Sequence, residues 1–595
     1  MRLKLVYAFI FLFFVVILSR VYYLSIKSNL YYEELAKQNS VKTYMIAPVR
    51  GMIYDTRGDL LAINELGFSI SIKPYLHIRK KNRPILDDEI FSILQFFPDL
   101  NASEIKKTYQ REDSYYNQDY IQVVDFISYD DMIKHYSNLN LRKNLKVEPQ
   151  VKRKYPYNEV ASHVIGYIGK ANTQDISENP ISKLTGHIGK SGIERYYNDV
   201  LQGEQGHREV RINALNKEIE ELSFKSAYSN DLNLSIDIRL QQYLSEIFSD
   251  NAGVAIVVDV DDGSILAAGS FPEYNLNSFV EGISVAEWKE LSNNPDHPFT
   301  NKMINGLYPP GSVVKMGVAL SFLKSGLMGA ASQITCEGFV ELGGRNFRCW
   351  NRSGHGHMDL KHALQQSCDV YFYEGGLRVG IDRIAPVLSN LGFGSKTGVD
   401  LPSEFIGTVP SREWKMLRYK REWSAGETLN TSIGQGAFLV TPMQIARYTA
   451  QIATGKNVRL HFFKNNLDFN KSVEDDEIFN EFDKSFLPYI REGMYAVMNE
   501  PGGTAYRYFN NFPIQVAGKT GTAQVINFSQ AEKKNIRESD LEYYSRSHTW
   551  ITSYAPYKKP KYVVTVLLEH GGRSTTSAKV TADIYRKMME LGYIK

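Results

Sequence analysis

The sequence predicts an α+β protein with a single N-terminal transmembrane helix, and three features of the chain predict it. An unbroken apolar run spans residues 5–18. In the first half of the chain, short apolar runs separated by glycine turns indicate β structure. In the second half, strand patterns lie at both ends with helical patterns between them, which indicates an α+β layout.

Length and composition indicate a folded protein of two or three packed domains. The chain has 595 residues, of which 43% are hydrophobic and 23% are charged, so no general disorder is expected. The net charge of +3 arises from 69 basic and 66 acidic residues spread along the chain. Because the sequence has no basic block, we expect no nucleic-acid partner.

The apolar run near the N-terminus predicts a cytoplasmic tip and membrane anchor over residues 1–27. Residues 21–24 extend the run to about 20 residues, the length that crosses a bilayer. A cleavable signal peptide is the alternative, but the bulky segment SRVYYLSIK lies where a cleavage site needs small residues. We therefore expect an uncleaved anchor. Basic residues flank both ends of the run, so they leave its orientation open.

Residues 28–231 are predicted to form a domain without catalytic motifs. Residues 29–38 have a helical pattern next to the membrane, and APVRGMIYDTRGDLLA, residues 47–62, indicates a β-hairpin. Residues 74–147 are rich in Lys, Asp, Tyr and Asn and have weak helical periodicity. This composition indicates a head subdomain inserted in the domain.

Residues 232–595 are predicted to form a second domain. Alternating apolar residues at 232–236 precede a helical pattern at 240–248, so a strand leads into a helix. The runs GVAIVVDV and SILAAGS flank a turn at 261–263 and predict a β-hairpin. Near the C-terminus, HTWITSY and KYVVTVLLE predict two more strands, and a helical pattern follows them.

A serine and a lysine three residues apart form the first candidate catalytic pair. In YPPGSVVK, Pro and Gly precede Ser312, so a helix can begin there and bring the Lys315 amine beside the Ser312 hydroxyl. A neutral lysine can accept the serine proton, and a nearby cation such as Lys519 favours the neutral amine. The pattern alone is weak, because it recurs at 103–106 and 321–324 and otherwise marks only a helix N-cap.

Two further motifs follow in the second domain. QSCDVYFY places Ser367 and Asp369 two residues apart, which in isolation is an ordinary helix start. VAGKTGTAQ places a polar motif at the end of an apolar strand, where glycine permits close approach of a ligand backbone. The motif residues are Lys519, Thr520, Gly521 and Thr522. A second Lys-Thr-Gly at 396–398 lies in a glycine-rich turn, so we predict a structural role for it.

The three motifs, in this chain order, resemble those of the penicillin-binding protein and serine β-lactamase superfamily. Residues 423–444, WSAGETLNTSIGQGAFLVTPMQ, are similar to the long signature between the second and third motifs of the transpeptidases. RGMIYDTRG, YPYNEVASHVIGYIG and GIERYYNDVLQGEQG resemble motifs of the non-catalytic pedestal in class B penicillin-binding proteins. Asp369, with FRCWNRSGHGHMDL at 347–360, resembles the elongation-type penicillin-binding protein 2 rather than the septal enzyme. The resemblance covers nearly the whole chain.

The resemblance implies a fold and an activity. The fold is an elongated pedestal, mainly β and α+β, followed by a transpeptidase domain with an antiparallel sheet flanked by helices. The activity is that of a peptidoglycan D,D-transpeptidase, a serine-type D-Ala-D-Ala acyltransferase that cross-links stem peptides during cell elongation. Such enzymes maintain cell shape and are acylated by β-lactam antibiotics. No organic cofactor is needed, because the ester retains the energy of the peptide bond.

The resemblance also implies a role for each residue of the first two motifs. Ser312 attacks the carbonyl of the penultimate D-Ala of a stem peptide and releases the terminal D-Ala, with Lys315 as the base. Ser367 relays protons to and from the leaving and incoming amines. Asp369 orients Lys315.

The third motif is implied to bind the substrate. Lys519 and Thr520 bind its carboxylate, and Gly521 allows the peptide backbone to approach. The backbone amides of Ser312 and Thr522 form the oxyanion hole. An amine of a neighbouring stem peptide then completes the cross-link.

All three cysteines lie within one short stretch, and they suggest a metal site. Cys336, Cys349 and Cys368, with His355 between the last two, make a tetrahedral zinc set, although the spacing lacks the knuckle of a zinc finger. The alternatives are a Cys336–Cys349 disulfide with a buried Cys368, or free thiols. Elongation-type relatives can hold zinc in this segment with acidic, His and Cys ligands, which favours a structural Zn²⁺. His357 is a rival ligand to His355.

Partners and location follow from the resemblance. We expect one helix in the inner (cytoplasmic) membrane and a catalytic domain on the periplasmic side. The expected ligands are peptidoglycan stem peptides and β-lactams. The expected partners are a SEDS-type glycosyltransferase (RodA-like) and an elongation scaffold (MreC-like), because no residues remain before the pedestal for a glycosyltransferase domain.

Four alternatives remain at the level of sequence. A septal class B transpeptidase belongs to the same class. A β-lactam-sensing receptor needs a cytoplasmic output domain, and only a few residues precede Leu5. A serine β-lactamase needs a glutamate that activates water, and the sequence identifies none. An inactive scaffold is disfavoured because all three motifs are intact.

Overall fold

The computed structural model divides the chain into two compact units. It describes residues 2–27, 40–213, 217–464, 478–525 and 541–595. The first unit comprises residues 1–51, 170–188 and 199–230, and the second comprises residues 52–169, 189–198 and 231–595. The helix expected at 29–38 lies outside the described residues.

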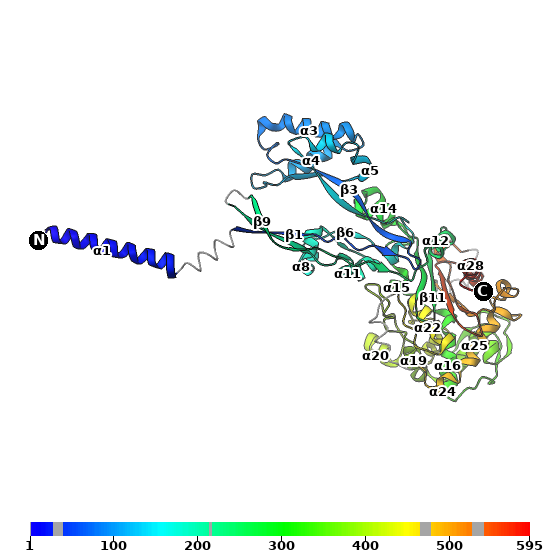
Figure 1. Ribbon diagram of the computed structural model, residues 1–595. Helices are drawn as coiled ribbons and strands as arrows, with labels where there is room; N and C mark the ends of the chain where they lie inside the picture. The colour runs from blue at the N-terminus through cyan, green and yellow to red at the C-terminus, as the bar shows by residue number, and fades with distance from the viewer. Residues whose placement is uncertain (1, 28–39, 214–216, 465–477, 526–540) are drawn as a thin grey trace. The chain divides into compact units, whose positions relative to one another are not determined.

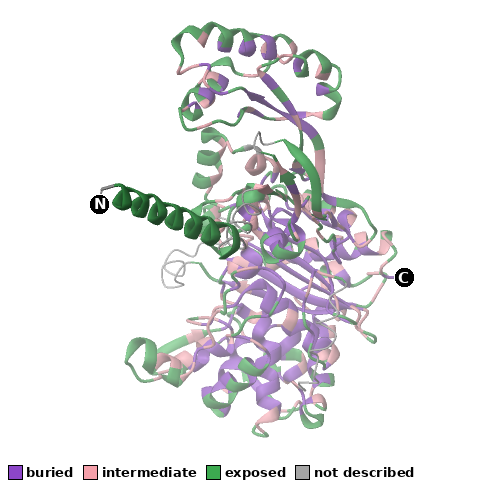
Figure 2. Ribbon diagram, turned by 60° about the vertical axis from the view of Figure 1, so that its left-hand side comes forward, coloured by how far each residue is buried: buried purple, intermediate pink, exposed green. Residues whose placement is uncertain are grey.

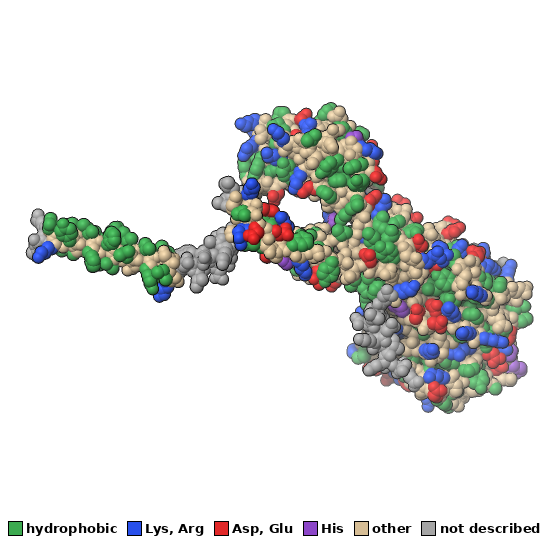
Figure 3. All heavy atoms as spheres, in the orientation of Figure 1, with side chains coloured by type: hydrophobic (Ala, Val, Ile, Leu, Met, Phe, Trp, Pro, Cys, Tyr) green, Lys and Arg blue, Asp and Glu red, His purple; other side chains and the backbone are tan. Residues whose placement is uncertain are grey.

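The N-terminal apolar segment is a helix, as predicted. Helix α1 spans Arg2–Tyr22, and a π-helical turn continues it over Tyr23–Lys27. The stretch Leu3–Lys27 is long and apolar enough to cross a bilayer, and no part of its most apolar window is buried inside the structure. Figure 3 shows hydrophobic side chains over most of the visible surface of this helix. An uncovered helix of this composition is more stable in lipid than in water.

The rest of the first unit is built on a three-stranded antiparallel sheet in the order β1 (Val41–Ile46), β8 (Gly206–Ile212) and β9 (Glu218–Lys225). Cross-strand charge pairs link the central strand to one edge strand, because Arg208 of β8 binds both Glu218 and Glu221 of β9. Most side chains of β9 are exposed. The hydrogen-bond ladder and these pairs therefore hold the sheet together more than apolar burial does.

The second unit begins with the predicted hairpin and a small head. Strands β2 (Ile53–Tyr54) and β3 (Leu60–Ile72) pair antiparallel, and β3 also pairs with β4 (Ile121–Ser128) and β5 (Leu145–Lys154). Helices α3 (Arg83–Phe96) and α4 (Ala102–Glu112) lie over these strands and share one apolar core with them (Figure 1). The weak helical periodicity noted within residues 74–147 therefore corresponds to these two helices.

The centre of the second unit is a five-stranded antiparallel sheet. Its strand order is β12 (Ile265–Phe271), β11 (Gly253–Asp259), β19 (Tyr562–Leu568), β18 (His548–Ala555) and β17 (Ala517–Ala523). The first four strands are the hairpin and the C-terminal pair that the sequence predicts. Because β17 is an edge strand, one row of its backbone N–H and C=O groups is free of sheet pairing.

Helices cover both faces of this sheet. Helices α12 (Ile238–Ile247) and α28 (Ser574–Glu590) pack on one face, and α22 (Pro442–Thr454) packs on the other (Figure 1). Buried residues are concentrated in the sheet and these helices (Figure 2). The strand predicted at 232–236 is shorter than expected, because β10 covers only Leu232–Asn233 and the N–H of Ser235 donates to the carbonyl of Phe462 instead.

A protonated carboxyl joins two parts of the second unit. The side chain of Glu273 accepts hydrogen bonds from the N–H of Ala161, at 2.7 Å, and from the Ser245 hydroxyl, at 2.6 Å. Desolvation by burial raises the pKa of Glu273 from 4.5 to about 8, although both hydrogen bonds oppose the shift. The folded protein therefore keeps this proton at neutral pH.

The Glu273 proton should make stability depend on pH. The folded state holds it up to pH about 8, whereas the unfolded chain releases it near 4.5, so the free energy of unfolding should fall as pH rises through this window. Glu273→Gln keeps a neutral side chain of the same shape and should reduce that slope. Urea unfolding at a series of pH values checks this, with the exposed Glu290→Gln as control. Equal slopes in wild type and Glu273→Gln would contradict the assignment.

Candidate active site

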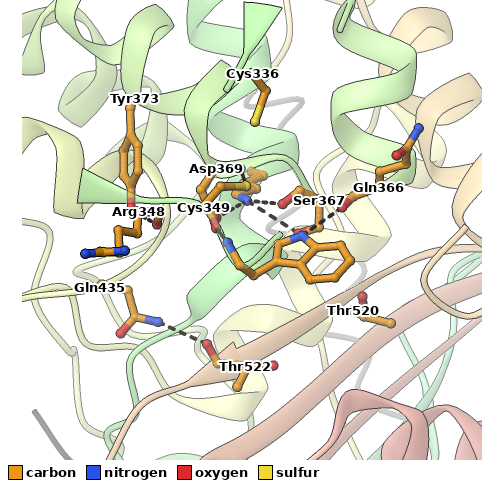
Figure 4. Close-up of polar contacts among 12 residues, drawn as sticks. Cys336, Arg348, Cys349, Gln366, Ser367, Asp369, Tyr373, Gln435, Thr520 and Thr522 are labelled. Carbon is orange, nitrogen blue, oxygen red and sulfur yellow. Dashed lines mark hydrogen bonds and ion pairs between the residues drawn. The ribbon is translucent and has the colours of Figure 1, made fainter. Parts of the chain in front are cut away.

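The three predicted motifs meet in one cleft of about 420 Å³ beside the edge strand β17. Figure 4 shows Ser367 and Asp369 on one side of this cleft and Thr520 and Thr522 on the other. Six predicted residues line it: Ser312, Ser367, Asp369, Thr520, Gly521 and Thr522. Lys315 and Lys519 lie behind the cleft wall, with side chains that are fully buried.

The candidate nucleophile lies at the start of a helix. Residues Gly311–Val314 form a 3₁₀ turn that leads into α16, Lys315–Lys324, so Ser312 and Lys315 occupy the expected first turn. Gly311 has a φ of +54°, and its N–H donates to the carbonyl of Gly434 at 2.9 Å. A Cβ atom at Gly311 would lie 2.5 Å from the carbonyl oxygen of Thr522. Only glycine therefore lets this loop lie against β17.

The other two Ser-x-x-Lys matches lie away from the cleft. Residues 103–106 belong to α4 in the head, where Lys106 pairs with Asp87. Residues 321–324 lie at the far end of α16, where Lys324 pairs with Asp483. The second Lys-Thr-Gly also has a structural role, because Glu404 accepts hydrogen bonds from the backbone and hydroxyl of Thr397.

Lys315 is held by three acceptors. Its Nζ lies 2.7 Å from Oδ1 of Asp369, 3.0 Å from the carbonyl oxygen of Ser367 and 3.4 Å from Oγ of Ser367. These three acceptors can stabilise the amine of Lys315 when it carries a proton. The expectation that Asp369 orients Lys315 thus has a direct geometric basis. Both Lys315 and Ser312 belong to the described residues, and their side chains form no hydrogen bond with each other. The amine of Lys315 instead faces Ser367 and Asp369.

The second motif has a constrained backbone. Ser367 lies between α17 (Leu360–Gln365) and α18 (Asp369–Val379), and its φ of +54° is in the left-handed region that non-glycine residues rarely adopt. This conformation directs both its hydroxyl and its carbonyl toward Lys315. Asp369 is the first residue of α18, where the helix dipole favours a carboxylate. Strain of this kind is common at functional sites.

The third motif lies within β17 rather than at its end, because the strand continues to Ala523. The carbonyl of Thr522 accepts a hydrogen bond from the side chain of Gln435 at 3.0 Å. In an extended strand, the N–H and C=O of one residue point to the same side, so the N–H of Thr522 also faces the cleft. The hydroxyl of Thr520 lies 2.6 Å from that of Thr504.

Lys519 is a buried amine without a carboxylate in contact. Its Nζ donates to the carbonyl of Thr520 at 2.9 Å. Burial lowers the pKa of Lys519 well below its usual value, and the nearby charge of Lys315 lowers it further, whereas Asp369 opposes the shift. An anion that enters the cleft would oppose this shift and favour the protonated form of Lys519.

The predicted cysteine cluster is assembled beside the second motif. The three cysteines are buried free thiols, so the alternative Cys336–Cys349 disulfide is wrong for this structure. Their sulfur atoms and a nitrogen of His355 all lie within 4.8 Å of one another. The thiol of Cys368 and the ring of His355 lower the pKa of Cys349 to about 3. His357 is not part of the cluster, because its ring contacts the hydroxyl of Thr335 at 3.0 Å.

The cluster has the dimensions of a tetrahedral zinc site. The Sγ atoms of Cys336 and Cys349 each lie 3.5 Å from Nδ1 of His355. Two ligands of a tetrahedral zinc, with bonds of about 2.3 Å to sulfur and 2.0 Å to nitrogen, lie roughly 3.5 Å apart. Three sulfurs and one imidazole are also a common zinc donor set. The residues therefore fit the ion.

Two hydrogen bonds connect the cluster to Asp369. The N–H of Asp369 donates to Sγ of Cys349 at 3.4 Å, and the N–H of Trp350 donates to Oδ2 of Asp369 at 3.0 Å. The carboxylate of Asp369 thus binds Lys315 with one oxygen and the segment after Cys349 with the other.

Sequence reasoning did not identify Trp350, Gln435 or Thr504, all of which line the cleft. Gln435 belongs to the segment 423–444 that resembles a transpeptidase signature, so a residue-level comparison with that signature could have found it. Trp350 directly follows Cys349 in the sequence. Thr504 had no sequence signal.

Comparisons with known proteins agree on one family. A family model described as the penicillin binding protein transpeptidase domain matches residues 253–590, and one described as the penicillin-binding protein dimerisation domain matches residues 45–234. The chain is 34% identical over 597 aligned residues to the peptidoglycan D,D-transpeptidase MrdA of Haemophilus influenzae. That alignment covers 97% of this chain and 89% of the relative.

Solved structures give the same result. The complex between penicillin-binding protein PBP2 and MreC from Helicobacter pylori matches with a TM-score of 0.85 and 41% identity over 93% of this chain and 99% of that chain. The structure of Pseudomonas aeruginosa PBP2 in complex with WCK 5153 matches with a TM-score of 0.68 and 28% identity over 91% of this chain and 96% of that chain.

Gly311 provides a test of the cleft geometry. Gly311→Ala should reduce labelling of Ser312 by a fluorescent penicillin by at least about 100-fold, because the new methyl group collides with the Thr522 carbonyl and displaces the loop by about 1 Å. Gly326→Ala is the matched control, since Gly326 has a similar φ of +70° but open space around its Cβ position. Equal labelling of the two variants would contradict the proposed close approach.

Proposed function

The chain belongs to the class B penicillin-binding proteins of the elongation type, and we propose that it cross-links peptidoglycan through an ester on Ser312. The transpeptidase activity follows from its family, and the residue roles are the proposal. The observation that carries it is the cleft in which Ser312, the Lys315–Asp369 pair and the edge of β17 meet.

Acylation needs a base and a path for one proton. As Oγ of Ser312 bonds to the carbonyl carbon of the penultimate D-Ala, its proton passes to the neutral amine of Lys315. The ammonium that results has the contacts seen in the structure, with Asp369 at 2.7 Å and the carbonyl of Ser367 at 3.0 Å. The hydroxyl of Ser367, 3.4 Å from Lys315, then gives its proton to the nitrogen of the departing D-Ala and takes one from the Lys315 ammonium, so both groups return to their starting protonation states.

Cross-linking reverses this path. The amine of a second stem peptide attacks the ester carbonyl and gives up one proton through Ser367 to Lys315. The proton then returns to Oγ of Ser312 as the ester bond breaks. The protein is restored, and one peptide bond replaces the bond to the released D-Ala.

The third motif supports the assignment of the substrate site. A peptide lying along β17 can pair with its free edge, and the amides of Ser312 and Thr522 are available for the carbonyl oxygen that becomes an oxyanion. We assign the terminal carboxylate to Thr520, which lines the cleft, with charge supplied by Lys519, which is buried behind it. The carboxylate would also compensate the buried amine of Lys519, whose pKa is lowered by burial.

The composition of the cleft favours transfer to an amine over hydrolysis. Among the described residues that line it, the only carboxylate is Asp369, and both of its oxygens have partners in Lys315 and Trp350. A class A serine β-lactamase activates water with a glutamate in its site. No such base lines the described part of this cleft.

We propose a location and a scaffold partner on the same grounds. Because peptidoglycan lies outside the cytoplasmic membrane, the helix Leu3–Lys27 would cross that membrane and leave the catalytic domain on the periplasmic side. The similar Helicobacter pylori protein was solved in complex with MreC, which supports an MreC-like scaffold as partner. The SEDS-type glycosyltransferase remains a prediction from the sequence.

We further propose that Cys336, Cys349, Cys368 and His355 hold one structural Zn²⁺. The distances of the donor atoms support this ion. When bound, zinc would fix the geometry of four ligands and take no part in the reaction. Because Cys368 lies between Ser367 and Asp369, a zinc bound to Cys368 would also hold the backbone of the second motif in place.

The nucleophile assignment predicts a single labelled serine. After exposure of the full chain in detergent to a fluorescent penicillin, peptide mass spectrometry should find the adduct on Ser312, and Ser312→Ala should abolish it. Ser103→Ala and Ser321→Ala should label like wild type, because both serines lie away from the cleft. An adduct that survives in Ser312→Ala would refute the assignment.

The metal assignment predicts a defined zinc content. Protein purified without added metal should contain about one zinc per chain by elemental mass spectrometry, since a Cys₃His set binds zinc tightly. His355→Ala should lower that ratio, and His357→Ala should leave it unchanged, because His357 lies outside the cluster. A ratio near zero in wild type would exclude a zinc site.

A further inference from the structure

We propose that Tyr308 is a positioning residue for Ser312 and that Glu569 and Lys302 hold it in place. The proposal rests on the proposed role of Ser312 as nucleophile. It concerns three residues to which the sequence analysis assigned no role. None of them lines the described cleft, so they would act through the loop that carries Ser312.

Tyr308 fixes one end of the loop before the nucleophile. Its N–H donates to the carbonyl of Val440 at 3.0 Å, and the N–H of Val440 donates back to its carbonyl at 2.9 Å. The ring of Tyr308 meets that of Trp550 at a centroid distance of 6.0 Å, and Nε1 of Trp550 donates to the carbonyl of Pro309 at 3.1 Å. Gly311 anchors the other end of the loop through Gly434.

The hydroxyl of Tyr308 ends in a buried charged network. It donates to Oε1 of Glu569 at 2.7 Å, while Oε2 of Glu569 pairs with Nζ of Lys302 at 2.8 Å. Lys302 also donates to the carbonyls of Phe271 and Asp296, each at 2.6 Å, so its three hydrogens have three acceptors. The side chains of Lys302 and Glu569 are 3% and 15% exposed. Burial of this kind keeps each partner in one place.

The network ties the nucleophile loop to the centre of the sheet. Glu569 directly follows β19, the middle strand, and its N–H donates to the carbonyl of Ala252 next to β11. Lys302 begins α15, Lys302–Asn305. Tyr308 is thus fixed by its backbone, its ring and its hydroxyl. The hydroxyl contact is the one that a single substitution can remove without changing the ring.

The test measures acylation by a fluorescent penicillin in the full chain, with the rate constant of the covalent step separated from the non-covalent affinity. Tyr308→Phe should slow the covalent step by about 10- to 100-fold and leave the affinity nearly unchanged, because a small displacement of the nucleophile affects attack and not binding. Tyr593→Phe is the matched control. It removes a similar bond, 2.8 Å long, to Asp237, which pairs with Arg239 away from the cleft.

A second arm tests whether Glu569 acts through Tyr308. Glu569→Gln should also slow the covalent step, and the double variant with Tyr308→Phe should be no slower than the slower single variant. Independent, multiplying effects would overturn the proposed chain of contacts. Rates in Tyr308→Phe equal to those in wild type, or equally reduced in Tyr593→Phe, would overturn the positioning role. If wild type formed no adduct on Ser312, the proposed function itself would fail instead.

Discussion

The active site depends on one buried ion pair, that between Lys315 and Asp369. The side chain of Lys315 is fully buried, and a cation there is stable only if an acceptor of opposite charge is in contact. Asp369 meets this need at the start of α18, where the helix dipole and the N–H of Trp350 also stabilise its carboxylate. The left-handed backbone of Ser367 adds two further acceptors. The first and second motifs therefore form one electrostatic unit.

A steric constraint brings the third motif close to Ser312. The loop that carries Ser312 lies against β17 because Gly311 has no side chain where it meets Thr522, and Gly434 has none where it meets Gly311. This close packing brings the amides of Ser312 and Thr522 to the same cleft and leaves the strand edge free. The proposed zinc set acts on the opposite wall, where Cys349 contacts the backbone of Asp369. Each wall of the cleft is thus fixed by short-range contacts rather than by the substrate.

Local chemistry explains what could be predicted from the sequence. The spacing of Ser312 and Lys315 specifies a shared helix face, and the runs that became β11, β12, β18 and β19 are rich in apolar and β-branched residues, so composition identified them. The four metal-binding candidates were identified because Cys and His are rare and soft ligands. Sequence could not decide between His355 and His357, because the pairing of β13 (Ile334–Cys336) with β16 (Gly356–Met358), which brings His357 next to Thr335, is a tertiary feature. The contact of Tyr308 with Glu569 joins residues 261 positions apart and had no local signal.

The most direct test of the account is the acylation rate of Asp369→Asn in the full chain. The substitution keeps the shape of the side chain and an acceptor for Trp350 but removes the charge that stabilises protonated Lys315. The covalent step with a fluorescent penicillin should slow by at least about 100-fold, because the ammonium that forms on Lys315 during attack would then be an unpaired buried charge, which costs several kcal/mol. A rate equal to that of wild type would show that the Lys315–Asp369 pair is not what the active site depends on.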